Sequence, residues 1–559
     1  MSEVQEFDHQ PVPPQRLHRA RHFAALYAGE HIAGTEFVIG AAFVAWGVAA
    51  IDVIFGLLLG NTLAVLTWRF VCAPIAVDTR MTLYAYLEKI TGKFFIFIYS
   101  IVNGILFAIL AGSMITVSAS AVRIPFGIEP QTHWYPTDIA FVLVALGVGA
   151  VVVTVAVYGF KRLAQFAQAV VPWMIVMFLV GALTLLPVLS RNAGLSMPIA
   201  SLNELWLIAK GQVWLGNEAG LSFWHVTAFA WVCNLAMHGS LGDMTILRYA
   251  RKASYGYFSA LGMFIGHFAA WIFAGVMGAG AGVILSKTII QLDAGEVAYQ
   301  ALGVSGIIAV IIAGWTTSNP TLYRAGLAFQ SLNPKWSRAW VTAIVGVITT
   351  IIACFPFVFT KLLSFVGLMG LTLAPVGAIL VTEHWLFPKM GLTRYWREYT
   401  RTALNWPALA SWIIGLLCAW LLNSIGLHLF FLLIPVWVIT TVVYIVLARI
   451  AGAASDYGEY AIATEQQLFD RKQAERAYLQ SSDAELEQNK PQTSLRLKLA
   501  NAISILALAV CVALGIYTLT LDAQQFDAGL QQVRSWLIWP TLVFFIVAII
   551  SSWWRAQEE

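Results

Sequence analysis

The chain is dominated by apolar runs that are each long enough to cross a lipid bilayer as a helix. One crossing takes about 20 mostly apolar residues. Only 11% of the 559 residues are charged, whereas a soluble domain carries roughly 25% charged residues. We therefore predict an all-α polytopic membrane protein with fourteen spans, near residues 22–47, 51–73, 94–122, 137–159, 163–188, 223–247, 257–284, 304–331, 339–360, 362–386, 405–423, 426–450, 498–520 and 535–554.

Basic residues orient these spans. With the N-terminus in the cytoplasm, the loops assigned to the outside hold only six of the 33 Lys and Arg residues. Because cytoplasmic loops carry an excess of Lys and Arg, this predicts cytoplasmic N- and C-termini in a cell membrane (inner or plasma). The five cysteines lie in apolar segments without a CxxC motif or a Cys/His cluster, which predicts neither a disulfide nor a metal site.

Charge and hydropathy divide the chain into four parts. Residues 1–21 form a cytoplasmic tail, 22–450 a twelve-span core, 451–497 a cytoplasmic helical linker, and 498–559 two additional spans with a short tail. The polar linker is most simply a solvated connector, and a regulatory or oligomer contact is the alternative. The last two spans hold no interior charge, so we expect a structural pair, and a homodimer contact stays open.

Polar and small residues interrupt the first span where the bilayer centre is expected. The segment 28–36 holds two carboxylates, one imidazole and two glycines. A charge at this depth costs at least about 2.5–3.5 kcal/mol on insertion scales, and irregular backbone is tolerated there only where it lines a cavity or is buried in protein. We predict a broken helix with Glu30, His31 and Glu36 at a site. For each glutamate, the alternative is a structural carboxylate paired with a neighbouring helix.

The third span carries Tyr99 and Asn103, which are one turn apart and share a face. An aromatic ring beside an amide would stack on a planar solute and hydrogen-bond its edge. The alternative is a tyrosine at the wet end of the helix and an asparagine that bonds a neighbouring helix.

The sixth span is also interrupted by polar groups and glycines. Asn234 and His238 are one turn apart and are site candidates, while we expect Asp243 to pair with Arg248 or to cap the following segment. Breaks in the first and sixth spans lie five helices apart. This spacing is typical of two inverted five-helix repeats with a binding site at their interface.

The eighth span holds Thr316, Thr317 and Asn319 just before a proline. Hydroxyls and freed carbonyls are hard oxygen ligands that suit a small cation. The alternative is that each hydroxyl bonds back to a carbonyl of its own helix, which is common in membrane helices.

Six segments, in this order along the chain, carry a family resemblance: Gly60-Asn61; Val157-Tyr158-Gly159-Phe160-Lys161 with Pro172; Gly242-Asp243 before Leu247-Arg248-Tyr249-Ala250-Arg251; Trp315-Thr316-Thr317 before Leu322-Tyr323; Pro375-Val376-Gly377 before Glu383-His384-Trp385; and Asn405-Trp406. Over about residues 22–450 the chain resembles the nucleobase:cation symporter-1 family of purine, cytosine, allantoin and hydantoin permeases.

The resemblance implies a leucine-transporter-type 5+5 inverted repeat and cation-coupled alternating access. It places Tyr99 and Asn103 where the family has a substrate-stacking Trp and a hydrogen-bonding Gln. It also implies a cation site made by Thr316 and Thr317 together with carbonyls from about Ala28 to Ile32, beside His31. The sixth span has Met237 and His238 where the family usually offers an aromatic ring.

We therefore expect a secondary active transporter, not an enzyme, that takes up a small planar nitrogen-containing solute such as a purine or pyrimidine. The threonine hydroxyls favour Na⁺, which we expect as the coupling ion, and H⁺ is the alternative that Glu30, His31 and Glu36 would favour. A second hypothesis is a carrier for a cationic or amine-bearing solute whose charge Glu30 or Glu36 meets. No other cofactor and no nucleic acid is expected, and the solute-binding candidates are Glu30, Glu36, Tyr99, Asn103, Asn234, His238 and Asn319.

Overall fold

The computed structural model describes residues 10–131, 133–157, 160–195, 197–217, 220–333, 335–356, 361–488 and 494–558. Within these residues the secondary structure is helical, with two isolated bridges and no strand. Ten helical segments in the described ranges are long and apolar enough to cross a bilayer: α3–α4 (Ala50–Thr79), α6 (Lys93–Val122), α7 (Ile139–Val157), the Ala169–Asn192 part of α8 (Phe160–Asn192), η5–α14 (Ala253–Leu285), α19–α20 (Leu362–Lys389), α22 (Trp406–Ser424), α23–η10 (Leu433–Ala453), α25 (Leu495–Leu519) and α26–α27 (Phe526–Trp554).

The protein is thus a multi-pass membrane protein, as its composition predicts. Shorter apolar helices and one helix with a polar centre fall at other predicted spans, so the count of fourteen stays a prediction. These and the remaining main elements are α1 (Ala20–Glu30), α2 (Thr35–Ala45), α5 (Leu83–Thr91), α9 (Leu202–Ile208), α10 (Phe223–Val232), α11 (Leu235–His238), α12 (Met244–Leu247), α15 (Ala294–Leu302), α16 (Val304–Gln330), α17 (Arg338–Ala353), α21 (Trp396–Thr400) and α24 (Gly458–Gln488).

Both predicted helix breaks are present. In the first span α1 ends at Glu30 and α2 begins at Thr35, with His31 at φ −106° and ψ 9° outside the helical region. In the sixth span α10 ends at Val232, the short helix α11 follows, and Leu241 then adopts a left-handed φ of 64°. The sequence breaks these helices because its glycine and polar residues weaken the intrahelical ladder there.

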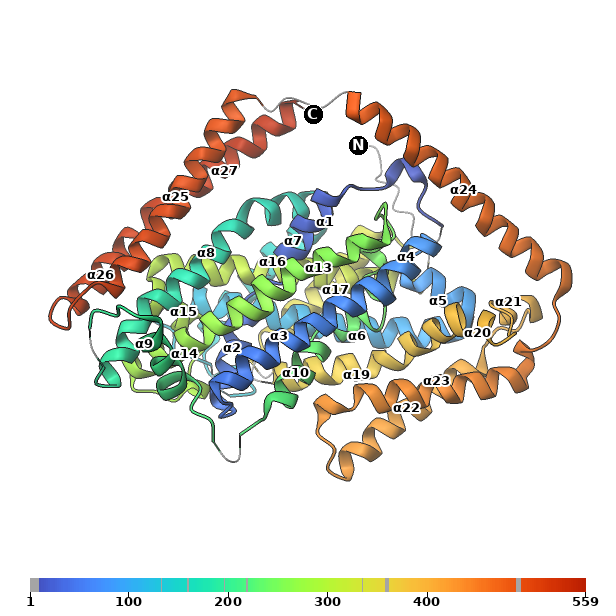
Figure 1. Ribbon diagram of the computed structural model, residues 1–559, viewed down its shortest axis with the longest axis horizontal. Helices are drawn as coiled ribbons and strands as arrows, with labels where there is room; N and C mark the ends of the chain where they lie inside the picture. The colour runs from blue at the N-terminus through green and yellow to red at the C-terminus, as the bar shows by residue number, and fades with distance from the viewer. Residues whose placement is uncertain are drawn as a thin grey trace.

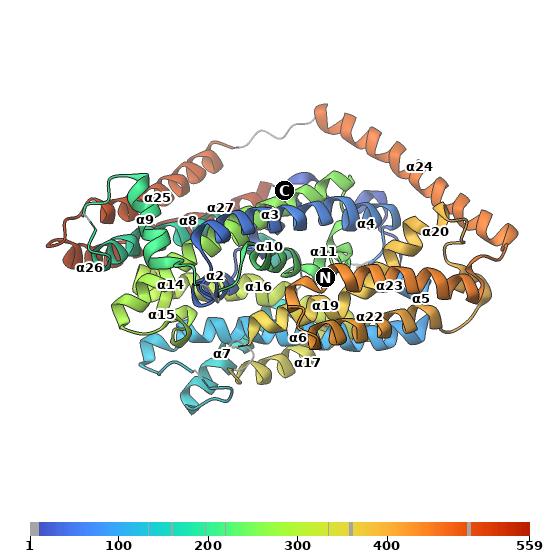
Figure 2. The same ribbon diagram turned by 60° about the horizontal axis from the view of Figure 1, so that its bottom comes forward.

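The centre of the molecule is built around α6 and α16, which lie against each other along much of their length. The broken helix α1–α2 packs on α8, α14 and α16, and α10 packs on α3. Figure 2 shows α17 beside α7 on the outer side of α6. The two broken helices are therefore enclosed by long, continuous ones.

The last two apolar helices pack against α8 (Figure 1). The indole Nε1 of Trp173 in α8 donates to Oγ1 of Thr541 in α27 at 3.1 Å, and its ring centroid lies 4.9 Å from that of Phe545. In α25, Thr518 donates to the carbonyl of Leu183 at 3.1 Å. These helices extend the membrane core on its α8 side.

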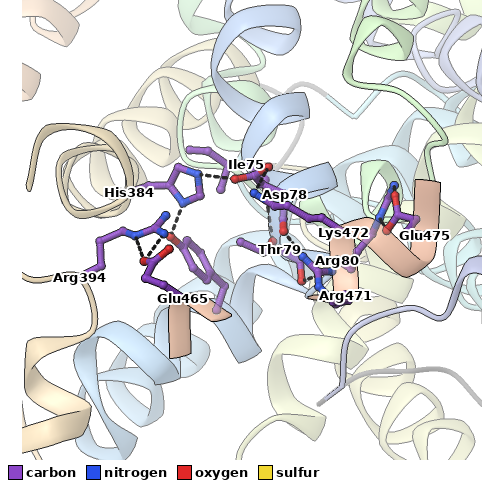
Figure 3. Close-up of polar contacts among 11 residues, drawn as sticks. Ile75, Asp78, Thr79, Arg80, His384, Arg394, Glu465, Arg471, Lys472 and Glu475 are labelled. Atoms are coloured by element: carbon purple, nitrogen blue, oxygen red, sulfur yellow. Dashed lines mark hydrogen bonds and ion pairs between the residues drawn. The ribbon is translucent and has the colours of Figure 1, made fainter. Parts of the chain in front are cut away.

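The charged helix α24 is held against the core through Arg80, which follows α4 (Figure 3). Arg80 is fully buried. Its guanidinium forms an ion pair with Glu475 of α24, with Nε donating at 2.9 Å, and also donates to the carbonyls of Arg248 at 3.0 Å and Ala250 at 2.5 Å. This one side chain therefore joins α24, the end of α4 and the segment after α12.

Three further contacts fix α24 (Figure 3). Arg471 donates to the carbonyls of Asp78 and Thr79 at the end of α4, and Lys472 lies 2.9 Å from the Asp78 carboxylate. Nearer the start of α24, the Glu465 carboxylate accepts a hydrogen bond from Arg394 at 2.5 Å. The predicted helical linker thus contains a helix whose stretch from Glu465 to Glu475 is tied to two separate parts of the core.

The Arg80–Glu475 pair predicts a clear stability effect. We expect Glu475→Gln to lower the free energy of unfolding in detergent by about 3 kcal/mol, because a buried guanidinium loses its charged partner. Glu465→Gln is the matched control, since the Glu465 side chain is 57% exposed and such pairs contribute less than about 1 kcal/mol. Equal thermal shifts for the two variants would contradict this account of α24.

Candidate functional site

The broken backbone between α1 and α2 lies directly against two glycines of η6 (Gly262–Ala270). A Cβ added to Gly266 would lie 1.8 Å from the His31 carbonyl oxygen, and one added to Gly262 would lie 2.6 Å from His31 Nδ1. On the opposite side, a Cβ on Gly34 would lie 3.3 Å from the backbone nitrogen of Gly314 in α16. The break thus lies between η6 and α16, and the approach of Gly266 to the His31 carbonyl is too close for a residue with a Cβ.

Glu36, in the first turn of α2, lies at the centre of a buried polar cluster. Its side chain is 1% exposed. The indole N–H of Trp271 donates to one carboxylate oxygen, and the Thr35 hydroxyl donates to the other at 3.1 Å. His267 Nε2 lies 3.7 Å from Glu36 Oε1, and the His267 ring stacks on Trp271 with centroids 4.3 Å apart. Among the described side chains, His267 is the ionisable group that forms an ion-pair contact with this carboxylate.

Two other predicted site residues lie next to the same histidine. The amide Nδ2 of Asn234 lies 3.2 Å from His267 Nδ1, and the His31 ring centroid lies 5.3 Å from that of His267. His31 also contacts Trp68 of η2 (Trp68–Cys72), whose ring centroid is 4.8 Å from that of His238. The two helix breaks therefore bring Glu36, His31, Asn234 and His238 into one cluster.

Asp243 forms a second buried network next to this cluster. Its carboxylate accepts from Arg324 of α16 at 3.0 Å, from Tyr27 of α1 at 3.1 Å and from Trp68 Nε1 at 2.6 Å. The prediction that Asp243 caps the following helix is wrong, since its side chain makes no cap hydrogen bond to α12. The carboxylate instead joins three elements distant in sequence, and the predicted pairing with Arg248 stays a prediction.

The predicted solute-binding residues Asn103 and Tyr99 lie in α6. Asn103 donates to the Tyr84 hydroxyl at 2.8 Å and lines a cavity of about 10 Å³ with Tyr84, Phe107, Gly242 and Arg324. That volume holds about one water molecule, so a planar solute would enter only if these helices moved apart. The Tyr99 ring instead packs near Tyr84 and Trp412, with centroids 6.2 and 5.9 Å away.

The predicted cation-site residues of α16 follow Gly314, which contacts Gly34 in the break between α1 and α2. Thr316 and Thr317 both donate to the Ala313 carbonyl, at 3.1 and 3.2 Å, and Asn319 donates to the Trp315 carbonyl at 3.0 Å. These hydrogen bonds match the alternative in which each hydroxyl bonds back to a carbonyl of its own helix. Each hydroxyl oxygen still keeps lone pairs that a cation could use. The adjacent Gly314 contacts Gly34, while Ala28 is buried in the last turn of α1.

Four of the residues singled out from the sequence lie in this cluster, and other members of the cluster were not singled out. Glu30 ends α1, but its side chain lies outside the described residues. A histidine inside the apolar segment 257–284 satisfies the same test that singled out His31, so His267 was detectable. The aromatic and cationic partners carried no such signal: Trp68, Trp271 and Arg324.

Comparisons with known proteins show the fold. No family model and no curated protein sequence matches this chain. Mhp1, described as a nucleobase-cation-symport-1 family transporter, is similar in a closed conformation with bromovinylhydantoin bound: TM-score 0.61 and 15% identity, covering 82% of this chain and 99% of that one. Its inward-facing conformation has TM-score 0.61 and 16% identity, covering 84% and 99%. A substrate-bound outward-open Na⁺-coupled sialic acid symporter has TM-score 0.50 and 13% identity, covering 80% and 91%.

These structures confirm the predicted leucine-transporter-type fold. The alignments with the two Mhp1 structures cover most of this chain and nearly all of Mhp1. At such low identity the likeness concerns the arrangement of helices, and the solute and ion need separate arguments from the residues of this chain.

The packing of the break predicts a position-specific effect of added methyl groups. We expect Gly266→Ala to lower the free energy of unfolding by about 1–3 kcal/mol or more, because the new Cβ overlaps the His31 carbonyl. Gly147→Ala in α7 is the control, since a Cβ there meets nothing within 4 Å and alanine favours a helix. Chemical denaturation in detergent measures both, and a Gly266→Ala protein as stable as the control would refute the close approach.

The Asp243 network predicts coupling between α12 and α16. We expect Asp243→Asn to cost about 3–5 kcal/mol of stability, because it leaves the buried Arg324 without its charged partner. Combining it with Arg324→Gln should cost less than the sum of the two single changes. Strictly additive unfolding free energies in this double-mutant cycle would show that the pair is not energetically linked.

Proposed function

We propose that this protein is a secondary active transporter that moves a small solute together with a cation by alternating access. The observation that carries the proposal is the meeting of two broken helices around buried polar side chains, inside a bundle of helices long and apolar enough to span a membrane. Breaks of this kind expose backbone and side-chain groups to a solute without exposing them to lipid. The fold shared with structures described as symporters supports the same conclusion.

The chemistry of the cluster favours a planar, nitrogen-containing solute such as a purine or pyrimidine. Trp68, Trp271 and His267 bring aromatic rings to the cluster, and Glu36 and Asn234 bring hydrogen-bonding groups beside them. Sites for small ligands typically combine aromatic walls with a few such polar groups. The bromovinylhydantoin described in the Mhp1 structure belongs to this chemical class.

A second candidate is a cationic or amine-bearing solute. It is favoured by the Glu36 carboxylate, which is buried and has a histidine rather than a Lys or Arg as its ion-pair contact among the described residues. A positively charged solute would compensate a carboxylate at this depth.

We also propose Na⁺ as the coupling cation. Na⁺ would use Thr316, Thr317 and backbone carbonyls from Ala28 to Ile32, which the contact of Gly34 with Gly314 keeps close to α16. We place the protein in a cell membrane with both termini in the cytoplasm, as the distribution of Lys and Arg favours.

Thermal stabilisation of the purified protein tests the solute. Uracil, adenine, hydantoin, allantoin and small amines are added separately, with Na⁺ or choline as the salt. A bound solute stabilises by about 2.7 kcal/mol at 100 times its Kd, so we expect a rise in the unfolding temperature with a heterocycle. Glu36→Gln should weaken a neutral ring only in part but abolish the effect of an amine.

Each outcome separates the candidates. Stabilisation by an amine alone would replace the heterocycle with the second candidate. A complete lack of stabilisation by every compound in either salt would overturn the proposed function.

A further inference from the structure

The charged helix α24 connects two parts of the face that we assign to the cytoplasm. Its Glu475 pairs with Arg80 at the end of α4, and its Glu465 pairs with Arg394, between α20 and α21 (Figure 3). The two glutamates are ten residues apart in one helix, which is about 15 Å along the helix axis. Because a helix does not stretch, the two anchors, Arg80 and Arg394, keep a fixed separation while both pairs hold.

The Arg80 anchor belongs with the broken helices. The Arg80 carbonyl accepts the backbone N–H of Val12 at 2.9 Å, and the guanidinium donates to the carbonyl of Arg248, which directly follows α12. Just before α1 begins, the backbone N–H of His18 donates to the Tyr249 carbonyl at 2.8 Å. The chain that enters the first broken helix and the chain that leaves the second therefore meet at this anchor.

The Arg394 anchor belongs with the continuous helix α6. Arg397 in α21 donates to the carbonyls of Glu88 and Lys89 in α5, both at 3.0 Å. Gly92 then joins α5 directly to the start of α6. Through α24, the two broken helices are thus linked to the long helix at the centre of the molecule.

The two anchors differ in how far they are removed from water. The side chains of Arg80 and Glu475 are 0% and 12% exposed, whereas those of Arg394 and Glu465 are 15% and 57% exposed. An exposed ion pair is weak and is screened by salt, while breaking a buried one is costly. Figure 1 shows α24 along the outside of the helical bundle. The helix can therefore separate from Arg394 and stay attached at Arg80.

We propose that α24 is a strap that restrains opening toward the cytoplasm, an inference that rests on the proposed function. In the arrangement described here, Arg80 and Arg248 are buried where the cytoplasmic ends of the helices meet. Alternating access requires the broken helices to move against the continuous ones, and a bound strap opposes this movement. Separation of Glu465 from Arg394 removes the restraint and increases the share of molecules that are open to the cytoplasm.

A distance measurement on the full chain in liposomes tests the strap without a solute. Nitroxides are attached to p-acetylphenylalanine in place of Lys93, at the start of α6, and Lys252, after α12, which are both exposed. Double electron–electron resonance then reports the separation of the two helix ends. Glu465→Lys places two positive charges together and should raise the share of longer distances at least about fivefold. Asp470→Lys, an equal change of charge at an exposed residue of α24, should leave the wild-type distribution.

A reversible cross-link tests the opposite direction. Arg394→Cys and Glu465→Cys are combined and joined by a short bis-methanethiosulfonate linker. Before linking, the missing ion pair should favour the longer distances, and after linking they should become rarer than in the wild type. Uptake of radiolabelled uracil, adenine or hydantoin into proteoliposomes should then fall at least about fivefold and return when the linker is reduced. Each single-cysteine protein treated with the same reagent is the control for the native cysteines.

The outcomes separate this inference from the proposed function. Identical distance distributions in the wild type, Glu465→Lys and the linked protein would overturn the strap, whatever the uptake. A lower unfolding temperature of Glu465→Lys with unchanged distances would likewise overturn it, since α24 would then only stabilise the fold. If no probe is taken up by any variant, the proposed function loses its support, and the distance measurement still decides whether α24 restrains the helices.

Discussion

The close approach of the α1–α2 break to Gly262 and Gly266 sets the chemistry at the centre of this molecule. A side chain at either glycine would overlap His31, so the backbone of η6 can reach the break only because both Cβ atoms are missing. His267 follows Gly266 directly, and this contact carries its ring to Glu36 and His31. A packing constraint between two backbones thus creates a buried pair of titratable groups.

Buried charges elsewhere are compensated across long sequence distances. Asp243 takes Arg324 as its partner, and Arg80 takes Glu475 of α24. Because an isolated buried charge is costly, each pair ties together elements that are distant in the sequence. The first pair links the two broken helices to α16, and the second anchors the charged helix α24 beside α4 (Figure 3).

The cluster that results combines two kinds of group. Trp68, Trp271 and His267 are its aromatic rings, while Glu36 and Asn234 are polar groups close to them. The threonines of α16 lie on another side of the break, where Gly34 meets Gly314. The same broken segment therefore contacts both the aromatic cluster and the helix that carries the threonines.

The sequence by itself determined the features that depend on local chemistry. Apolar runs long enough for a bilayer predicted the membrane helices, and the polar segments near Glu36 and His238 predicted both helix breaks, because hydropathy and helix propensity act over a few neighbouring residues. Only the tertiary structure decided the partners: Trp271 meets Glu36 across 235 residues of chain, and Asp243 meets Arg324. Such pairs depend on how closely helix backbones approach one another, and no local pattern in the sequence encodes that distance.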